Sequence, residues 1–258
     1  MYTCPSELFC KRLLGVGTQT PNAAVLFELG RYPVALHYHL RCVKFWLKLL
    51  SMPDSRLPKS SYHMLKALDE QGRQTWASSV RSLLQQLDFG YVWTAQGVVN
   101  EDMFLSIFET RLKEHLTSEL RTQLENCSKL AIYSTFKSRF EPELYLKCVT
   151  IRKHRVALSK LRLSNHALKI ETGRHQGIEV ANIICPMCMN QGNVVLEDEF
   201  HFIMCCPTYD VLRHNYLPHI AGTEVSYQVF IDVTSFNQSD LLAAYVYHAF
   251  KLRKSLIL

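Results

Sequence analysis

The chain has 258 residues, of which 48% are hydrophobic and 20% are charged, and this composition is typical of a globular protein. No apolar run reaches the roughly 18 residues that a membrane-spanning helix needs, and the N-terminal stretch lacks the basic and then apolar order of a signal peptide. We therefore expect an intracellular protein, in the nucleus or the cytoplasm, with no membrane contact.

Proline and glycine residues divide the first half of the chain into short helical segments. Each segment starts after a proline or a capping residue and stops at a glycine or before another proline. Asn100 is a predicted N-cap, because Glu101 and Asp102 follow it in the first turn, where the helix dipole favours acidic residues. The predicted helices cover residues 21–29, 34–52, about 61–71, 75–88 and 101–126.

The segment at 150–163, TIRKHRVALSKLRL, has the pattern of an amphipathic helix with a basic face. At about 100° per residue, apolar residues fall on one arc and basic residues on the other, so we expect the first arc to be buried and the second exposed. The apolar arc consists of Ile151, Ala157, Leu158 and Leu161, and the basic arc of Arg152, Lys153, Arg155, Lys160 and Arg162.

The basic excess of the whole chain lies in and beside this helix. The net charge of the chain is +6, and residues 147–175 contain eight Lys and Arg against the single acid Glu171, a local charge of +7. A helix face that is merely solvated usually mixes both signs, so the imbalance favours contacts with the phosphates of RNA or DNA. We find no aromatic platform for unpaired bases, which predicts little base reading. The candidate nucleic-acid-binding residues are Arg152, Lys153, Arg155, Lys160, Arg162, Lys169 and Arg174.

Further along the chain, the pattern predicts more helices and little strand. The additional predicted elements are short helices within 128–149, short strands at 192–196 and 225–231, and a last helix at 239–254. The predicted fold class is therefore mainly α, an array of short helices with a small zinc-knuckle-like unit near the C-terminus. The predicted regions are a helical region at 1–145, the basic helix with the knuckle at 146–220, and a C-terminal segment at 221–258 whose terminal helix packs back.

Four of the nine cysteines lie in a short segment with a histidine, and four of these five residues have the spacing of a metal site. Cys185, Cys188, His201 and Cys206 form a C-x2-C-x12-H-x4-C pattern. Thiols stay reduced inside cells, so disulfides are not expected, and three thiolates with one imidazole suit a closed, structural zinc site. On a continuous helix His201 shares a face with Cys205, whereas Pro207 breaks the helix and lets Cys206 turn inward. Geometry alone leaves both cysteines open as the fourth ligand.

Four segments in this order resemble one region of known proteins. They are CKRLLGVGTQTPNAAVLFELGRYPV, CSKLAIYSTFK, YLKCVTIRKHRVALSKLRLSNHALKIETGRHQGI and CPMCMNQGNVVLEDEFHFIMCCPTYDVLR. The region is the C-terminal part of the polyprotein of LINE-type (non-LTR) retrotransposons, which follows the reverse transcriptase domain. The resemblance covers the chain from about residue 9 to the last helix. It implies a CCHC zinc knuckle whose last cysteine directly precedes a proline, and this favours Cys206 over Cys205.

The resemblance does not bring catalytic machinery with it. The chain contains no Asp-Asp pair of the kind that binds metal in reverse transcriptases, no cluster resembling the family's endonuclease, and no G-x-S-x-G nucleophile motif. We therefore expect no enzymatic activity.

Two hypotheses for the function follow. The first is a non-catalytic accessory module that binds RNA or DNA through the phosphate backbone, with a reverse transcriptase domain as a further partner. The alternative is a zinc-stapled, helical protein-interaction or scaffolding domain, an inactive remnant of such an element. Salt-sensitive binding to nucleic acid distinguishes the first hypothesis from the second.

Overall fold

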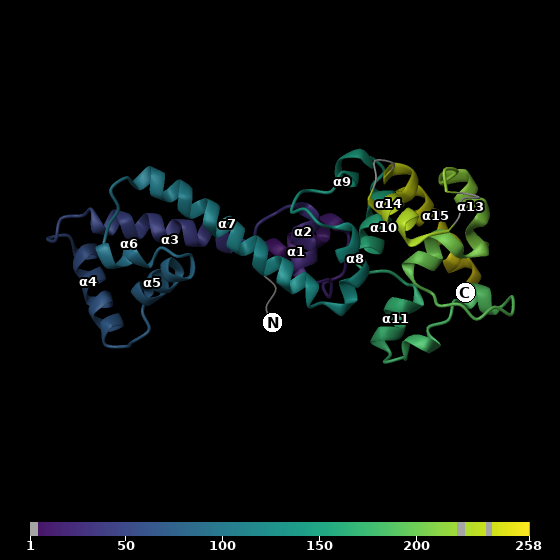
Figure 1. The fold of residues 1–258 in the computed structure, drawn as a ribbon, viewed down its shortest axis with the longest axis horizontal. Helices are drawn as coiled ribbons and strands as arrows, with labels where there is room; N and C mark the ends of the chain where they lie inside the picture. Colours follow the sequence, from purple (N-terminus) through teal and green to yellow (C-terminus); the bar gives the residue numbers. More distant parts are fainter. Residues whose placement is uncertain (1–4, 221–224, 236–238, 258) are drawn as a thin grey trace. The chain divides into compact units, whose positions relative to one another are not determined.

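In a computed structural model, which describes residues 5–220, 225–235 and 239–257, the protein is mainly α-helical (Figure 1), as predicted. The chain divides into two compact units, one made of residues 1–31 and 120–258 and the other of residues 32–119. The boundaries at 145 and 220 that we predicted from the sequence do not coincide with this division. The reason is that residues near the N-terminus share a core with residues beyond 120, a pairing that local patterns do not encode.

The unit at 32–119 is a helical array around two tryptophans. Its helices are α3 (Ala35–Leu50), α4 (Leu57–Glu70), α5 (Trp76–Gln86), α6 (Gly90–Ala95) and most of α7 (Glu101–Glu125). The ring of Trp46 stacks on that of Trp93 at 5.6 Å, and its indole N–H donates to the hydroxyl of Tyr62 at 3.0 Å. The predicted cap of α7 is confirmed, because the N–H of Met103 donates to Oδ1 of Asn100 at 2.9 Å.

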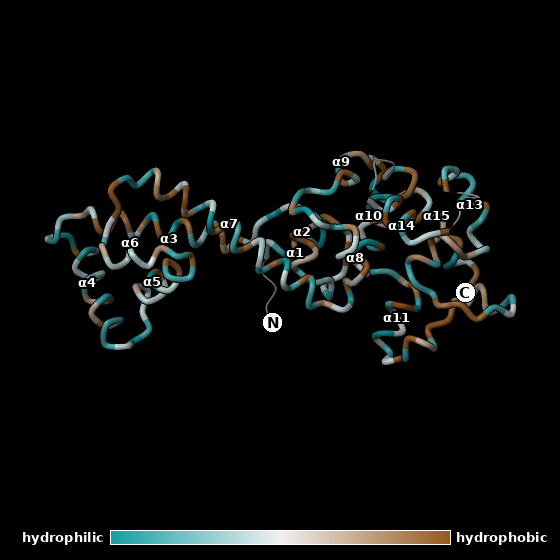
Figure 2. The backbone as a smooth tube through the Cα atoms, in the orientation of Figure 1, coloured by the Kyte–Doolittle hydropathy of each residue, from teal (hydrophilic) through white to brown (hydrophobic). Residues whose placement is uncertain are grey.

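The other unit contains the remaining elements, most of them short. They are α1 (Pro5–Leu14), α2 (Asn22–Leu29), η1 (Ser128–Leu130), α8 (Ala131–Phe136), α9 (Tyr145–Cys148), α10 (Arg152–Arg162), α11 (Lys169–His175), η2 (Val180–Asn182), α12 (Pro186–Met189), η3 (His201–Cys205), η4 (Pro207–Tyr209), α13 (Asp210–Tyr216), α14 (Tyr227–Ser235) and α15 (Ser239–Ile257). In both units hydrophobic and hydrophilic residues are interspersed along the helices (Figure 2).

The two predicted strands are absent from the described residues. The stretch at 192–196 contributes only one isolated antiparallel bridge, between Ile184 and Leu196. The prediction of a strand at 225–231 is wrong, since helix α14 starts at Tyr227. A short apolar run fits the periodicity of a strand as well as that of a helix. Here the run is helical, and Phe230 is buried in the core. No helix within the described part of the chain is long and apolar enough to cross a membrane.

The basic helix forms as predicted, but two residues of this segment differ from the prediction in their exposure to solvent. Helix α10 packs along α15 and buries Leu158 and Leu161. Ile151, predicted to be buried, is 49% exposed, because it is the N-cap and lies outside the regular helix. Arg162, predicted to be exposed, is only 5% exposed. It lies four residues after Leu158, about 40° around the helix, and so shares the buried side.

Arg162 is instead the centre of a buried polar network. Its Nε donates to Oε1 of Glu28 at 2.6 Å, its Nη2 lies 2.8 Å from Oε2 of Glu143, and its Nη1 donates to the carbonyl of Thr234 at 2.8 Å. The guanidinium carbon also lies 4.5 Å from the ring centroid of Phe136. A fully paired guanidinium of this kind ties α2, the segment before α9, α10 and α14 together and is not available to a phosphate.

Gly30 ends α2 in a left-handed conformation, and we expect its replacement to be costly. Its φ is +56°, and a Cβ atom there would lie 2.5 Å from Cδ and the backbone nitrogen of Pro142. Gly30→Ala should therefore lower the free energy of unfolding by about 2 kcal/mol or more, as measured by urea denaturation. Gly177→Ala is the matched control, because Gly177 has φ +68° but no atom near the new Cβ, so only strain of about 1 kcal/mol applies. Equal losses in the two variants would contradict the clash with Pro142.

Candidate functional site

The first two cysteines of the predicted metal site lie on a tight turn that the backbone holds closed. Cys185 is the N-cap of α12, and its N–H donates to the carbonyl of Val195 at 2.8 Å. A second hydrogen bond lies two residues further from the turn on each side, where the N–H of Glu197 donates to the carbonyl of Ile183 at 2.9 Å. These two hydrogen bonds fold residues 186–194 back on themselves. Cys188 follows three residues after Cys185 on the same short helix, so both thiols face one point.

The other two side chains come from a wide helical turn that ends at a proline. Residues His201–Cys205 form a π-helix, closed by a 2.9 Å hydrogen bond from the N–H of Cys206 to the carbonyl of His201. A bond between residues five apart brings Cys206 over His201, which an α-helical turn would not do. Cys206 then has extended backbone angles ahead of Pro207. The predicted helix break is therefore confirmed, and Cys206, not Cys205, joins the cluster.

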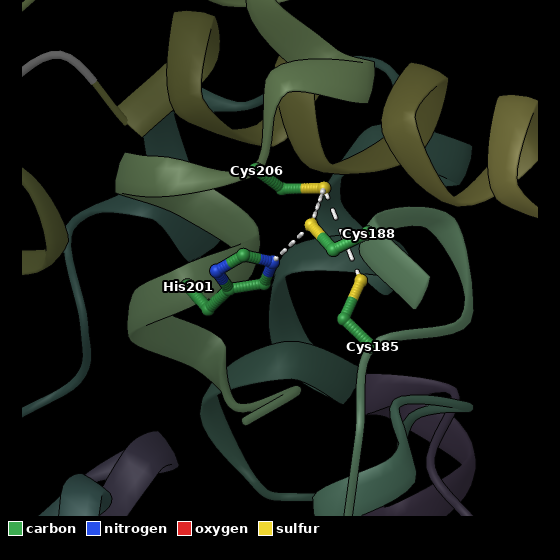
Figure 3. A group of neighbouring side chains, drawn as sticks. All are labelled: Cys185, Cys188, His201 and Cys206. Atoms are coloured by element: carbon green, nitrogen blue, oxygen red, sulfur yellow. Dashed lines mark hydrogen bonds between the residues drawn. The ribbon is translucent and has the colours of Figure 1, made fainter. Parts of the chain in front are cut away.

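The four side chains point toward one another (Figure 3), and their ligand atoms all lie within 4.8 Å of one another. The Sγ atom of Cys206 is 4.0 Å from that of Cys185 and 3.8 Å from that of Cys188, and Nε2 of His201 is 3.3 Å from Sγ of Cys188. Around a tetrahedral zinc ion, sulfur atoms lie about 3.8 Å apart and a sulfur and a nitrogen about 3.5 Å apart. The cluster therefore has the dimensions of a metal site and could hold one ion.

All four side chains are buried, and their mutual charges oppose ionisation of more than one thiol. A hydrogen bond to the Cys206 thiol, together with burial, raises the pKa of Cys185 to about 12. Burial also raises the pKa of Cys188, whereas the hydrogen bond from Cys185 lowers the pKa of Cys206. A divalent cation opposes the raised pKa values, because it stabilises every thiolate that it binds. The donor set thus favours a cation at its centre.

Two residues that the sequence did not single out hold the π-helical turn of His201–Cys205 in place. Arg213 donates from Nε to the carbonyl of Ile203 at 2.9 Å and from Nη2 to that of Cys206 at 3.0 Å. Asp198 accepts the N–H of His201 at 2.7 Å, as an N-cap does. These contacts satisfy backbone groups that a π-turn leaves unpaired, so they set the direction of both ligand side chains.

A buried ion pair fastens the last helix to the metal-binding segment (residues 183–210). Arg253 of α15 donates from Nε and Nη2 to the two carboxylate oxygens of Glu197 at 3.0 and 2.8 Å. Glu197 also accepts the N–H of Lys169 at 2.6 Å. Neither residue stands out in the sequence, where each is one charge among many. Their pairing shows that α15 packs back onto the segment that carries the ligands.

The seven candidate nucleic-acid-binding residues separate into two groups. Four of them do not line the groove described next: Arg162, which is buried with Glu28 and Glu143; Arg174, which is paired with Glu171 at 2.8 Å; Arg155, which donates to the carbonyl of Val149; and Lys169. Arg152, Lys153 and Lys160 form the second group, and they are brought together at one surface. The predicted basic face is therefore smaller than the helical wheel implies.

These three residues line a groove of about 1190 Å³ between α10 and α15. Lys254 and Arg253 join them from α15, although Arg253 is paired with Glu197, and no Asp or Glu lines the groove. Its apolar lining consists of Ile151, Val156, Ala157, Ala167, Tyr247, Phe250 and Ile257. Among the described residues, no carboxylate forms an ion pair with the other four cations, Arg152, Lys153, Lys160 and Lys254. We call this the α10–α15 groove.

Comparisons of the chain with family models, with curated proteins and with solved structures gave no match. The chemistry of the site therefore follows from the geometry of this chain's own residues.

Proposed function

We propose that this chain is a non-catalytic, nucleic-acid-binding accessory module derived from a non-LTR retrotransposon, with a structural zinc ion in the Cys185, Cys188, His201 and Cys206 cluster. In such an element it would act beside the reverse transcriptase domain of the same polyprotein. The sequence segments that resemble these polyproteins support the origin. The observation that supports nucleic-acid binding is the α10–α15 groove, which no carboxylate lines and in which four cations form no ion pair among the described residues.

The donor set supports zinc as the metal. Three thiolates and one imidazole are soft ligands, and tetrahedral arrangements of this kind bind zinc in preference to the hard cations calcium and magnesium. Four protein ligands leave no position for water, so the ion would be structural. Its role is to stabilise the metal-binding segment, whose short helices and turns have few regular backbone hydrogen bonds of their own.

The position of the cations in the groove supports contact with phosphates. Lys153 and Lys160 are on α10 and Lys254 is on α15, so both walls are positive. A cleft lined by charges of one sign concentrates counter-charged ligands, and displacement of counterions from nucleic acid makes such binding strongly dependent on salt. Lys153 is also held in place, with Nζ 4.9 Å from the ring centroid of Tyr247.

Removing these charges should weaken binding without unfolding the protein. The triple variant Lys153→Gln, Lys160→Gln, Lys254→Gln should bind RNA and DNA less tightly and about equally so for all sequences. The slope of log affinity against log salt should become shallower by up to about 0.9 per lost contact on duplex DNA and ~0.7 on single strands. Fluorescence anisotropy over a series of salt concentrations measures both effects.

A second triple variant with the same change of charge is the control. Arg12, Arg139 and Lys147 are exposed in the same unit and do not line the groove. Their replacement by Gln should leave the salt slope near that of the unmodified protein. If both triple variants weaken binding alike, then net charge and not the groove is responsible, and the proposal fails.

A protein-interaction or scaffolding domain is the second candidate function, because the floor of the groove is apolar. Val156, Ala157 and Phe250 offer nothing to a phosphate. They would suit the apolar side of an acidic amphipathic helix. An unchanged salt slope in the lysine variant, together with binding of an acidic amphipathic peptide, would favour this alternative.

A further inference from the structure

The structure contains a second positively charged surface, on a helix that the sequence pattern did not single out for binding. Helix α3 contains no acidic residue, and its exposed side combines two aromatic rings with four basic or titratable side chains. Tyr38 is 58% exposed and Phe45 is 49% exposed. We call this the α3 face, and it consists of His37, Tyr38, Arg41, Lys44, Phe45 and Lys48.

These six residues form two parallel rows. The first row is basic and consists of His37, Arg41, Lys44 and Lys48. With 3.6 residues per turn, these four positions fall within about 60° of one another around the helix, and Tyr38 and Phe45 form the second row along the side next to them. The rows extend over about 16 Å of helix. The opposite side of α3 carries the core residues Val43 and Trp46, so the helix cannot turn to bury the rings.

Charge and packing keep the face available to an anionic ligand. Within the described part of the chain, Arg41, Lys44 and Lys48 form no ion pair. The carboxylate of Glu109 on α7 is bound to Lys113 at 2.6 Å, which is the main cause of its lowered pKa, and the charges of Lys44 and His37 lower that pKa further. The Phe45 ring also makes an edge contact with the ring of Trp76, with the ring centroids 5.8 Å apart, and this contact helps to hold it in place.

We propose that the α3 face binds single-stranded RNA or DNA. An unpaired strand carries flat bases beside a regular row of phosphates, and this matches a row of rings beside a row of cations. A base stacked on an aromatic side chain contributes without regard to its identity. A duplex hides the faces of its bases and gains only from the cations. The face therefore prefers single strands, whereas the proposed groove on α10 and α15 contacts phosphates of either form.

This inference does not depend on the zinc ion or on the α10–α15 groove, because α3 belongs to the unit at 32–119. It differs from our expectation from the sequence that the chain lacks an aromatic platform. The two rings are seven residues apart on α3 and are separated by Arg41 and Lys44 in the sequence. Only the exposure of both rings on one side of a folded helix identifies them as a pair.

The test compares binding of a labelled single-stranded oligonucleotide with binding of the duplex of the same sequence. In the full chain, the double variant Tyr38→Leu, Phe45→Leu keeps apolar bulk against Trp76 and removes the flat rings. It should lose at least about 20-fold in affinity for the single strand, since two stacked bases are lost, and should change duplex affinity less than twofold. Circular dichroism and thermal unfolding should match the unmodified protein.

A charge variant and two controls complete the experiment. Arg41→Gln, Lys44→Gln, Lys48→Gln should flatten the salt slope on the single strand by up to about 0.7 per lost contact, or about 2 in all. The controls are Tyr91→Leu, an exposed aromatic ring of the same unit that lies outside the face, and Arg73→Gln, an exposed cation after α4. Both should bind as the unmodified protein does.

The possible outcomes separate this inference from the proposed function. If the leucine variant binds the single strand normally while the groove variant does not, the α3 face is no nucleic-acid site and the groove proposal stands. If the leucine variant loses its preference for single strands while the groove variant retains it, the α3 proposal stands. If the unmodified chain binds neither oligonucleotide but captures an acidic amphipathic peptide through Tyr38 and Phe45, the face docks protein and the inference is overturned.

Discussion

Replacing Cys206 with serine is expected to release zinc and unfold the metal-binding segment, whereas replacing its neighbour Cys205 is expected to do neither. Cys206 is fully buried with its Sγ atom 3.8 and 4.0 Å from the other two thiols of the cluster. Cys205 is half-buried and lies outside the group. Structural zinc supplies folding free energy on the order of 10 kcal/mol in small modules, which is comparable to the whole stability of a typical domain.

Native mass spectrometry of the purified chain should find about one zinc per molecule, lost in Cys188→Ser and Cys206→Ser and retained in Cys205→Ser. The Cys205→Ser protein should also unfold at nearly the same urea concentration as the unmodified protein. Adding a chelator to the unmodified protein should reproduce the unfolding of the Cys206 variant. Metal-free protein with all cysteines reduced and normal stability would rule out the structural zinc site.

Replacing Arg162 with glutamine should destabilise the unit at 1–31 and 120–258 by about 3–5 kcal/mol. The change leaves the fully buried carboxylate of Glu28 without a cation, and Glu143 keeps only its ion pair with Lys137. It also leaves the carbonyl of Thr234 without its donor. Urea denaturation monitored by far-ultraviolet circular dichroism measures the loss.

Two further variants show whether the loss comes from the buried charge. Arg152→Gln on the same helix removes an exposed cation and should change stability by no more than about 0.5 kcal/mol. Combining Arg162→Met with Glu28→Leu should recover much of the stability, because the buried acid that needed a partner is then gone. If Arg162→Gln alone were as stable as the unmodified protein and bound nucleic acid less tightly, Arg162 would belong to the phosphate-binding surface after all.

The sequence by itself determined the helical character of the chain and three members of the metal cluster, Cys185, Cys188 and His201, whereas the structure decided for Cys206 over Cys205 as the fourth. Local signals were sufficient for this, because they act between residues a few positions apart. Gly30 ends α2, Asn100 caps α7, and Pro207 ends the turn that carries His201 and Cys206. A pattern of thiols and one imidazole at ligand spacing is similarly local in character, and the structure brings all four side chains together.

Only the tertiary structure decided which charges face solvent and which unit each segment joins. Helical periodicity places a residue on an arc, but it does not say what packs against that arc. Arg162 is buried because Glu28, 134 positions earlier in the chain, is buried beside it. Arg253 pairs with Glu197 across 56 positions for the same reason. Such pairs form where the burial of apolar neighbours brings distant segments together, and each then offsets the cost of removing the other's charge from water.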